Sequence, residues 1–175
     1  MKTKLLFVAF FALLFTGCKD EKKEQEAPAP KEPQFSVTFE MTVLTDDDFA
    51  LLYTEDGSTQ FGENVIWAQV KGNPAPQMIT YTVPEGRYPT QLRLDLGLKE
   101  PKDVIFHAVS FDYAGKSKKI TGEDLKFYFR ADTSKCVYDP VTGAITPVEK
   151  DGKKLNGSLY PMEATLGPEL MNLAK

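Results

Sequence analysis

Apolar and polar residues alternate without exception along residues 35–43, FSVTFEMTV. A period of two predicts a strand with one face buried and the other in water. Turn residues such as Asp46, Gly72 and Gly86 separate shorter segments that also suit strands. These further predicted strands are residues 49–54, 65–70, 77–83 and 91–96.

The segment 104–113, VIFHAVSFDY, is apolar on both sides of its alternation. It predicts an interior strand with both faces covered. A second hairpin is expected from residues 135–138 and 144–148, joined by the turn residues 139–143. Pro147 has no N–H to donate, so the outer arm of this hairpin should be an edge strand.

Helical signals are few. Thr121 and Asp124 have the spacing of a capping box, so the segment that follows Thr121 predicts one or two helical turns, although its alternation also fits a strand. Pro168 suits the first position of a short terminal helix that runs to Leu173.

These elements predict one folded domain over residues 35–175, with no internal repeat and no second boundary. About eight short strands at regular spacing are typical of an all-β fold. We therefore expect a single antiparallel β-sandwich, of jelly-roll or immunoglobulin-like kind, with at most one or two short helices.

The amino-terminal segment has the pattern of a secretory signal. Residues 5–15 form an uninterrupted apolar run after Lys2 and Lys4, and the run is shorter than the roughly 20 residues of a membrane span. Thr16 and Gly17 then lead directly into Cys18, which resembles the lipobox of bacterial lipoproteins. The resemblance implies a signal peptide of residues 1–17, cleaved between Gly17 and Cys18, and acyl chains on Cys18. A plain cleaved signal, or an uncleaved anchor with an incidental cysteine, is the alternative.

Residues 18–34 hold three prolines in a mixed-charge segment and predict a disordered tether behind the lipidated cysteine. Lys19, Asp20 and Glu21 resemble the export signal that some Gram-negative groups use for lipoproteins at the outer face of the outer membrane. That resemblance implies a surface-exposed, lipid-anchored protein of the cell outer membrane. The periplasmic face is the alternative, and a plain soluble linker explains these residues equally well.

Charge and cysteine content narrow the classes of partner. Loss of residues 1–17 removes Lys2 and Lys4 from the 21 basic residues, which leaves 19 against 25 acidic residues and a formal charge of about −6. Nucleic acids and anionic membrane surfaces bind basic fields, so neither is an expected ligand. With Cys18 alkylated, Cys136 has no partner for an intramolecular disulfide.

The chain offers few groups for catalysis. His107 is the only histidine, and a core imidazole satisfied by hydrogen bonds is the favoured interpretation. Cys136 is interpreted as a small buried hydrophobe. We therefore expect a protein that is not an enzyme. A glycan hydrolase stays as a less favoured alternative, which would need Asp112 to converge with Asp95 or Glu123.

Asp46, Asp47 and Asp48 form the densest acidic cluster. Oxygen ligands in a loop suit calcium, so a calcium site at Asp46 and Asp48 is one interpretation, and a solvated turn is the favoured one. No other cofactor is expected.

Two interpretations of Trp67 stay open. A flat ring near amides and charged groups binds sugars, because the ring packs on the apolar face of a pyranose. A tryptophan buried between two sheets is favoured, because Val65 and Trp67 share one face of their strand. Arg93 and Asp95 alternate outward from three leucines, either as a polar surface pair or as the rim of a ligand groove.

Residues 81–112 contain the segment VPEGRYPTQLRLDLG followed by the segment VIFHAVSFD. This order is similar to that in carbohydrate-binding-like jelly-roll modules of bacterial surface proteins and glycosyltransferases. The resemblance implies glycan binding. We therefore expect a lipid-anchored envelope protein that binds carbohydrate or polysaccharide. A non-catalytic structural or assembly subunit, docked on another envelope protein, is the alternative.

Overall fold

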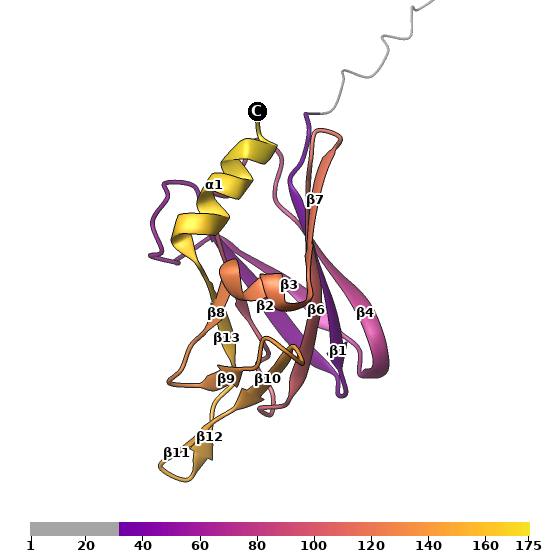
Figure 1. The fold of residues 1–175 in the computed structure, drawn as a ribbon, viewed down its shortest axis with the longest axis vertical. Coiled ribbons are helices and arrows are strands. Elements are labelled where there is room, and N and C mark those ends of the chain that lie inside the picture. Colours follow the sequence, from indigo (N-terminus) through magenta and orange to yellow (C-terminus); the bar gives the residue numbers. More distant parts are fainter. Residues whose placement is uncertain (1–31) are drawn as a thin grey trace, which may run out of the picture. The chain divides into compact units, whose positions relative to one another are not determined.

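The computed structural model describes residues 32–175 (Figure 1). The predicted signal peptide, the predicted lipid attachment site Cys18 and most of the predicted tether lie outside the described residues. The first buried side chain is that of Phe35, which immediately precedes the first strand.

Two antiparallel sheets pack face to face and confirm the predicted all-β sandwich. Sheet A contains β1 (Ser36–Val43), β4 (Asn73–Thr82), β6 (Val104–Tyr113), β7 (Lys116–Thr121), β9 (Cys136–Tyr138) and β10 (Ala144–Pro147). Sheet B contains β2 (Asp47–Thr54), β3 (Val65–Val70), β5 (Gln91–Asp95), β8 (Phe129–Ala131) and β13 (Ser158–Pro161). A small hairpin, β11 (Glu149–Lys150) with β12 (Lys153–Lys154), stands apart from both sheets.

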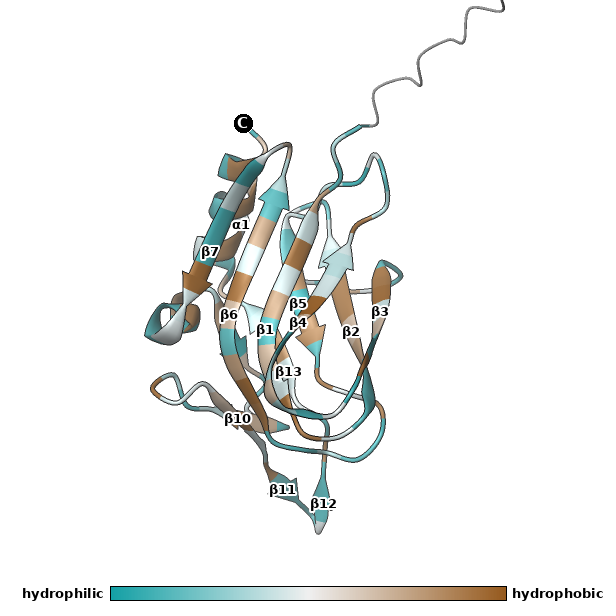
Figure 2. Ribbon diagram, turned by 90° about the vertical axis from the view of Figure 1, so that its right-hand side faces the viewer, coloured by the Kyte–Doolittle hydropathy of each residue, from teal (hydrophilic) through white to brown (hydrophobic). Residues whose placement is uncertain are grey.

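The strand order is β4-β1-β6-β10-β9 in sheet A, where β7 also pairs with β6, and β3-β2-β5-β13-β8 in sheet B. The chain passes repeatedly between the sheets, so strands distant in sequence share one core. Phe39 packs at the centre of this core, with its ring 5.9 to 6.0 Å from the rings of Phe106, Phe129 and Tyr81. The alternation that predicted β1 is visible along that strand in Figure 2.

β6 is an interior strand as predicted, but a bulge explains its two apolar sides. Glu40 on β1 pairs with Ala108, whereas the next residue, Met41, pairs with Phe106, so His107 is an extra residue on β6. An extra residue shifts the alternation by one position. Phe106 before the bulge and Val109 after it therefore both point into the core.

The 135–148 hairpin is confirmed as β9 and β10, but the predicted edge is wrong. β10 pairs with β6 through Ala144 and Ile145, and β9 is the outer strand. Pro147 is tolerated because it lies beyond the part of β10 that pairs with β6.

Two short helices accompany the sheets. The 3-10 helix η1 (Gly122–Phe127) confirms the predicted helical turns, but Thr121 makes no side-chain capping bond. Helix α1 (Glu163–Leu173) starts five residues before Pro168, so the prediction that Pro168 opens it is wrong. α1 packs against β5, β6 and β7, and it buries Leu166, Leu170 and Leu173.

Gly143 provides a stability test of the β9–β10 turn. Its φ is +75°, its carbonyl accepts a 2.8 Å hydrogen bond from the N–H of Phe106, and an added Cβ would overlap the carbonyl oxygen of Phe106. Gly115 has a similar φ of +79° with open space around it. We expect Gly143→Ala to lower the free energy of unfolding by about 1–3 kcal/mol more than Gly115→Ala, as overpacking does. Urea unfolding measures both, and equal losses would show that the turn accommodates the methyl group.

Candidate functional site

Trp67 lies on the outer face of sheet B, on the edge strand β3. Its side chain is 55% exposed, so the favoured prediction of a core tryptophan is wrong. Ile66 and Ala68 pack against the core instead, which turns Val65, Trp67 and Gln69 outward. Both faces of this strand begin with apolar residues, and the sequence alone did not show which one is buried.

Trp67 and Asp95 line the same hollow, of about 120 Å³, on this outer face. The strand register explains their proximity, because Trp67 and Asp95 both pair with Ala50 on the intervening strand β2. Ala50 has a small side chain, which leaves space between its larger neighbours. We call this site the Trp67 hollow, and its lining residues are Trp67, Asp95, Gly97, Leu98, Lys135, Asn156, Gly157 and Ser158.

Arg93 and Asp95 both point outward from β5, as predicted, and form a two-pronged ion pair. Nε of Arg93 lies 2.8 Å from Oδ1 of Asp95, and Nη2 lies 2.9 Å from Oδ2. The guanidinium carbon of Arg93 is 4.7 Å from the ring centre of Tyr160, and that of Arg130 is 5.3 Å from it. A ring between two guanidinium groups holds both in place. Arg93, Tyr160 and Arg130 thus form a row on the outer face, on strands β5, β13 and β8, which follow β2 in the direction away from Trp67.

A buried ion pair supports one wall of the hollow. The side chain of Asp47 is fully buried and contacts the ammonium group of Lys102. Its Oδ1 also accepts hydrogen bonds from the N–H groups of Leu98 at 2.9 Å and Lys99 at 3.1 Å. Burial raises the pKa of Asp47, but Lys102 and the backbone donors lower it more, so its pKa lies below the ordinary value.

Gly97 lies directly over this carboxylate, with a φ of +119°, and an added Cβ would approach Oδ2 of Asp47 too closely. The ion pair therefore holds the segment of Gly97 and Leu98 that lines the Trp67 hollow. Sequence reasoning missed this role of Asp47, because Lys102 is distant in the sequence and only the fold brings them together.

Asn156 contributes a polar group without a partner. Its Nδ2 donates to the carbonyl of Lys99 at 3.1 Å, but its buried Oδ1 accepts no hydrogen bond from the described residues. Buried acceptors in proteins normally have a donor, from the chain, from water or from a ligand.

The predicted calcium ligands Asp46 and Asp48 each lie near a different lysine. Asp46 accepts hydrogen bonds from Nζ of Lys71 at 2.7 Å and from the N–H of Gly72 at 2.9 Å. Asp48 lies 3.9 Å from Nζ of Lys99. Within residues 32–175, no three acidic, histidine or cysteine side chains are grouped as metal ligands would be.

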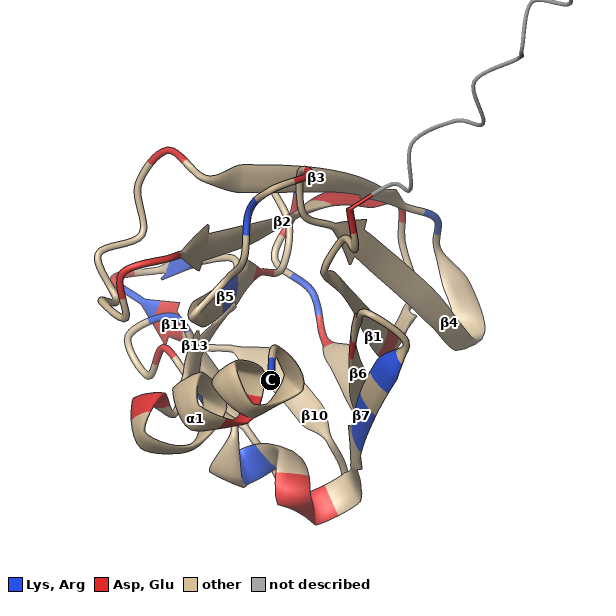
Figure 3. Cartoon of the chain, turned by 90° about the horizontal axis from the view of Figure 1, so that it is seen from above, with Lys and Arg blue, Asp and Glu red and all other residues tan. Residues whose placement is uncertain are grey.

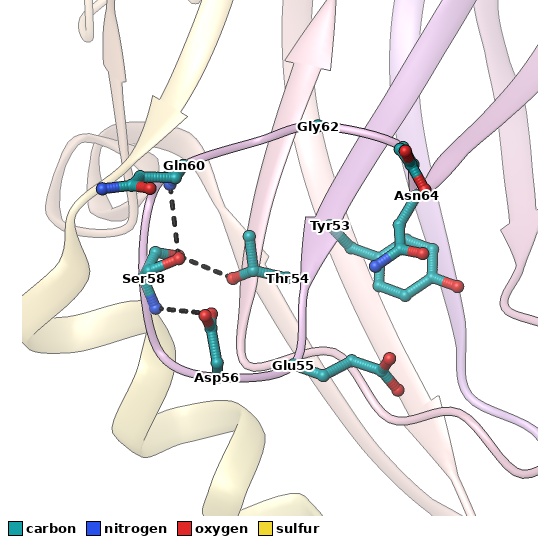
Figure 4. Close-up of a pocket in the computed structure, with 9 residues that line it drawn as sticks. Tyr53, Thr54, Glu55, Asp56, Ser58, Gln60, Gly62 and Asn64 are labelled. Atoms are coloured by element: carbon teal, nitrogen blue, oxygen red, sulfur yellow. Dashed lines mark hydrogen bonds between the residues drawn. The ribbon is translucent and has the colours of Figure 1, made fainter.

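A larger hollow, of about 360 Å³, lies beside the loop between β2 and β3 (Figure 4). Its polar groups bind one another: Thr54 Oγ1 donates to the carbonyl of Ser58, and the N–H of Ser58 donates to Asp56 Oδ1. Glu55 pairs with Arg87 at 2.7 Å. Hydrogen bonds from Ser58 lower the pKa of Asp56, whereas a glycosidase general acid needs a raised one.

The carboxylates considered for catalysis lie on different elements. Asp112 points outward from β6 in sheet A and Asp95 points outward from sheet B, so the two lie on opposite faces of the sandwich. Glu123 is in η1, paired with Lys126 at 3.2 Å. His107 is half-buried on the outer face of sheet A rather than in the core, with Nε2 2.9 Å from Thr42 Oγ1. Cys136 is fully buried as predicted, and burial raises the pKa of its thiol.

The chain matches no family model, no curated protein and no solved structure. No helix among residues 32–175 is long and apolar enough to cross a membrane.

Proposed function

We propose that residues 32–175 form a non-catalytic domain that binds carbohydrate through the Trp67 hollow. The observation that carries the proposal is a tryptophan ring, 55% exposed on a rigid strand, beside charged and amide groups in one hollow. The ring offers a flat apolar surface to a sugar, and the surrounding polar groups suit its hydroxyls. The unpaired Oδ1 of Asn156 is an acceptor that a ligand hydroxyl, or a water that the ligand holds, would satisfy.

Three lining residues of the hollow, Trp67, Asp95 and Ser158, lie on strands of sheet B, and the other five lie in connecting segments. Trp67 and Asp95 are positioned by the ladders of β3 and β5 with β2, and the paired Asp47 carboxylate holds the N–H of Leu98. A site that is formed before the ligand arrives loses little conformational entropy on binding.

Affinity electrophoresis of residues 32–175 through gels that contain single polysaccharides tests the proposal. We expect retardation by at least one neutral or acidic polysaccharide, and no retardation of an unrelated protein of similar size and charge. A panel without any retardation would remove carbohydrate from the proposal.

We further propose that a lipid on Cys18 displays this domain at the cell envelope, on the outer face of the outer membrane. Support comes from the order of Thr16, Gly17 and Cys18 after an apolar run, and from the charged residues behind them. Replacement of Cys18 by serine should abolish metabolic labelling of the chain with fatty acid, because serine lacks the thiol that is alkylated. Undiminished labelling of the Cys18→Ser chain would contradict lipidation at this position.

A further inference from the structure

β3 is an edge strand without the usual protection. It pairs with β2 alone among the described residues, over six residues and without a register shift. Its sequence, VIWAQV, has no charge and no proline. Natural proteins protect strand edges with lysines, prolines, bulges or very short strands, because a free edge pairs readily with another strand.

The other edges of the sandwich carry such protection. β7 has Lys116, Lys118 and Lys119, and β8 and β9 are three residues each. β4 is uncharged, but it contains Pro74 and Pro76 and its ladder with β1 has a register shift. Figure 3 shows this difference, with blue lysines on β7 and no charged residue on β3.

The backbone groups on the open side of β3 are those of Val65, Trp67 and Gln69. The N–H of Tyr53 donates to the carbonyl of Asn64 at 3.1 Å, and in an antiparallel ladder the bonded positions recur every second residue. Ile66 and Ala68 therefore bond to β2, while Val65, Trp67 and Gln69 direct their N–H and C=O groups away from it. The N–H and C=O groups of these three residues are thus available for pairing with one more strand.

We propose that two copies of this chain join through their β3 strands, in antiparallel register centred on Trp67. In this register Trp67 pairs with Trp67 of the second copy, and Val65 pairs with Gln69 of the second copy, so all three open positions bond to one another. Charge favours this occupant, because an uncharged edge places no like charges opposite each other when it meets itself, whereas β7 would place lysine near lysine. Without residues 1–17 the chain has a formal charge of about −6, so two copies repel each other, and an uncharged edge adds nothing to this repulsion.

The pairing has a consequence for the outer face of sheet B. A two-fold axis between antiparallel strands is perpendicular to the sheet, so both outer faces remain on the same side. The two Trp67 residues, about 5.5 Å apart at Cα as in a bonded antiparallel pair, then lie at the centre of one continuous ten-stranded face. Each copy adds a tryptophan to the surface beside the other copy's hollow.

Cross-linking tests this register directly. In the double variant Val65→Cys/Gln69→Cys, each new thiol should lie opposite one from the second copy, about 5.5 Å away at Cα. Residues 65 and 69 of one strand are about 14 Å apart, so a short thiol cross-linker cannot join them within one chain. Cys136, the only other cysteine of residues 32–175, is buried. We expect the double variant to give a product of twice the chain mass, and neither single variant to give it.

Sedimentation equilibrium of the unmodified residues 32–175 provides the second measurement. We expect a monomer–dimer equilibrium that Trp67→Lys shifts to monomer, because two lysines would then face each other, and that Thr80→Lys on β4 leaves unchanged. A chain that remains monomeric at its highest soluble concentration overturns the proposal. Loss of the dimer in Thr80→Lys, or cross-linking of either single cysteine variant, assigns the contact to another surface and overturns it equally.

Discussion

Replacement of Asp47 by asparagine is expected to lower the free energy of unfolding by about 3–5 kcal/mol, because it leaves a mostly buried ammonium group without its counter-charge. The side chain of Asp47 is fully buried and that of Lys102 is only 12% exposed. The same carboxylate accepts the N–H groups of Leu98 and Lys99. Urea unfolding of residues 32–175 at neutral pH, followed by circular dichroism, measures the loss.

Asp46 supplies a matched control. It also accepts hydrogen bonds from a lysine and from a backbone N–H, but its pair with Lys71 is exposed. Exposed ion pairs contribute little, because water solvates both charges after the pair is broken. Asp46→Asn should therefore cost much less than Asp47→Asn. Similar losses in the two variants would mean that the buried pair has no special role.

The difference between the unmodified chain and Asp47→Asn should also depend on pH. The pKa of Asp47 is lowered in the folded state relative to its ordinary value of 3.8. Its contribution to stability is thus complete above that ordinary value and is lost as the pH falls through the lower, folded-state pKa. Unfolding curves at a series of pH values should show the difference shrink only under acid conditions. A difference that shrinks toward alkaline pH would have the wrong sign.

Local patterns predicted most of the strands. β3 and β6 have the predicted bounds, and β1, β2, β4 and β5 differ from prediction by at most a few residues. Each of these strands has an alternation of apolar and polar residues, or an apolar run, and turn residues mark where it begins or ends. β7 was not predicted, because its sequence KSKKIT is nearly all polar. It is a strand because it pairs along its whole length with residues Ala108 to Tyr113 of β6. Its conformation thus depends on a partner strand rather than on its own pattern.

The bulge in β6 shows a limit of reasoning from alternation alone. Val104 and Phe106 are out of phase with Val109 and Phe111, and the pattern was interpreted as burial of both faces. A single extra residue at position 107 produces the same pattern with burial of one face. Only the partner strand distinguishes the two, since β1 fixes which residues lie opposite each other.

The candidate site was predicted in part. The outward direction of Arg93 and Asp95 follows from the three leucines that alternate with them, and the structure confirms it. The exposure of Trp67 could not be deduced, because an edge strand with two apolar faces does not show which face has a partner sheet. Tyr160 and Arg130 reach the same face through β13 and β8, which are distant in the sequence from β5. Their part in the site depends on the order of strands in sheet B.

Replacement of Trp67 by alanine should weaken carbohydrate binding by about 10- to 100-fold, provided that a polysaccharide retards the unmodified chain. Burying an aromatic side chain contributes roughly 1.5–3 kcal/mol, and each 1.4 kcal/mol corresponds to tenfold in affinity. The ring makes no hydrogen bond within the described residues that its loss would leave unsatisfied, so the fold should tolerate the change. Dissociation constants from affinity electrophoresis, at several polysaccharide concentrations, give the ratio.

Two further variants separate stacking from a general loss of apolar surface. Met78 on β4 is 59% exposed, close to the exposure of Trp67, but it lies in the other sheet and outside the hollow. Met78→Ala should leave the affinity unchanged, and Trp67→Phe should retain most of it, because a phenyl ring still offers a flat face. Sedimentation of Trp67→Ala beside the unmodified chain determines whether dissociation of a dimer contributes to the loss. Equal weakening by Trp67→Ala and Met78→Ala would place the carbohydrate elsewhere on the molecule.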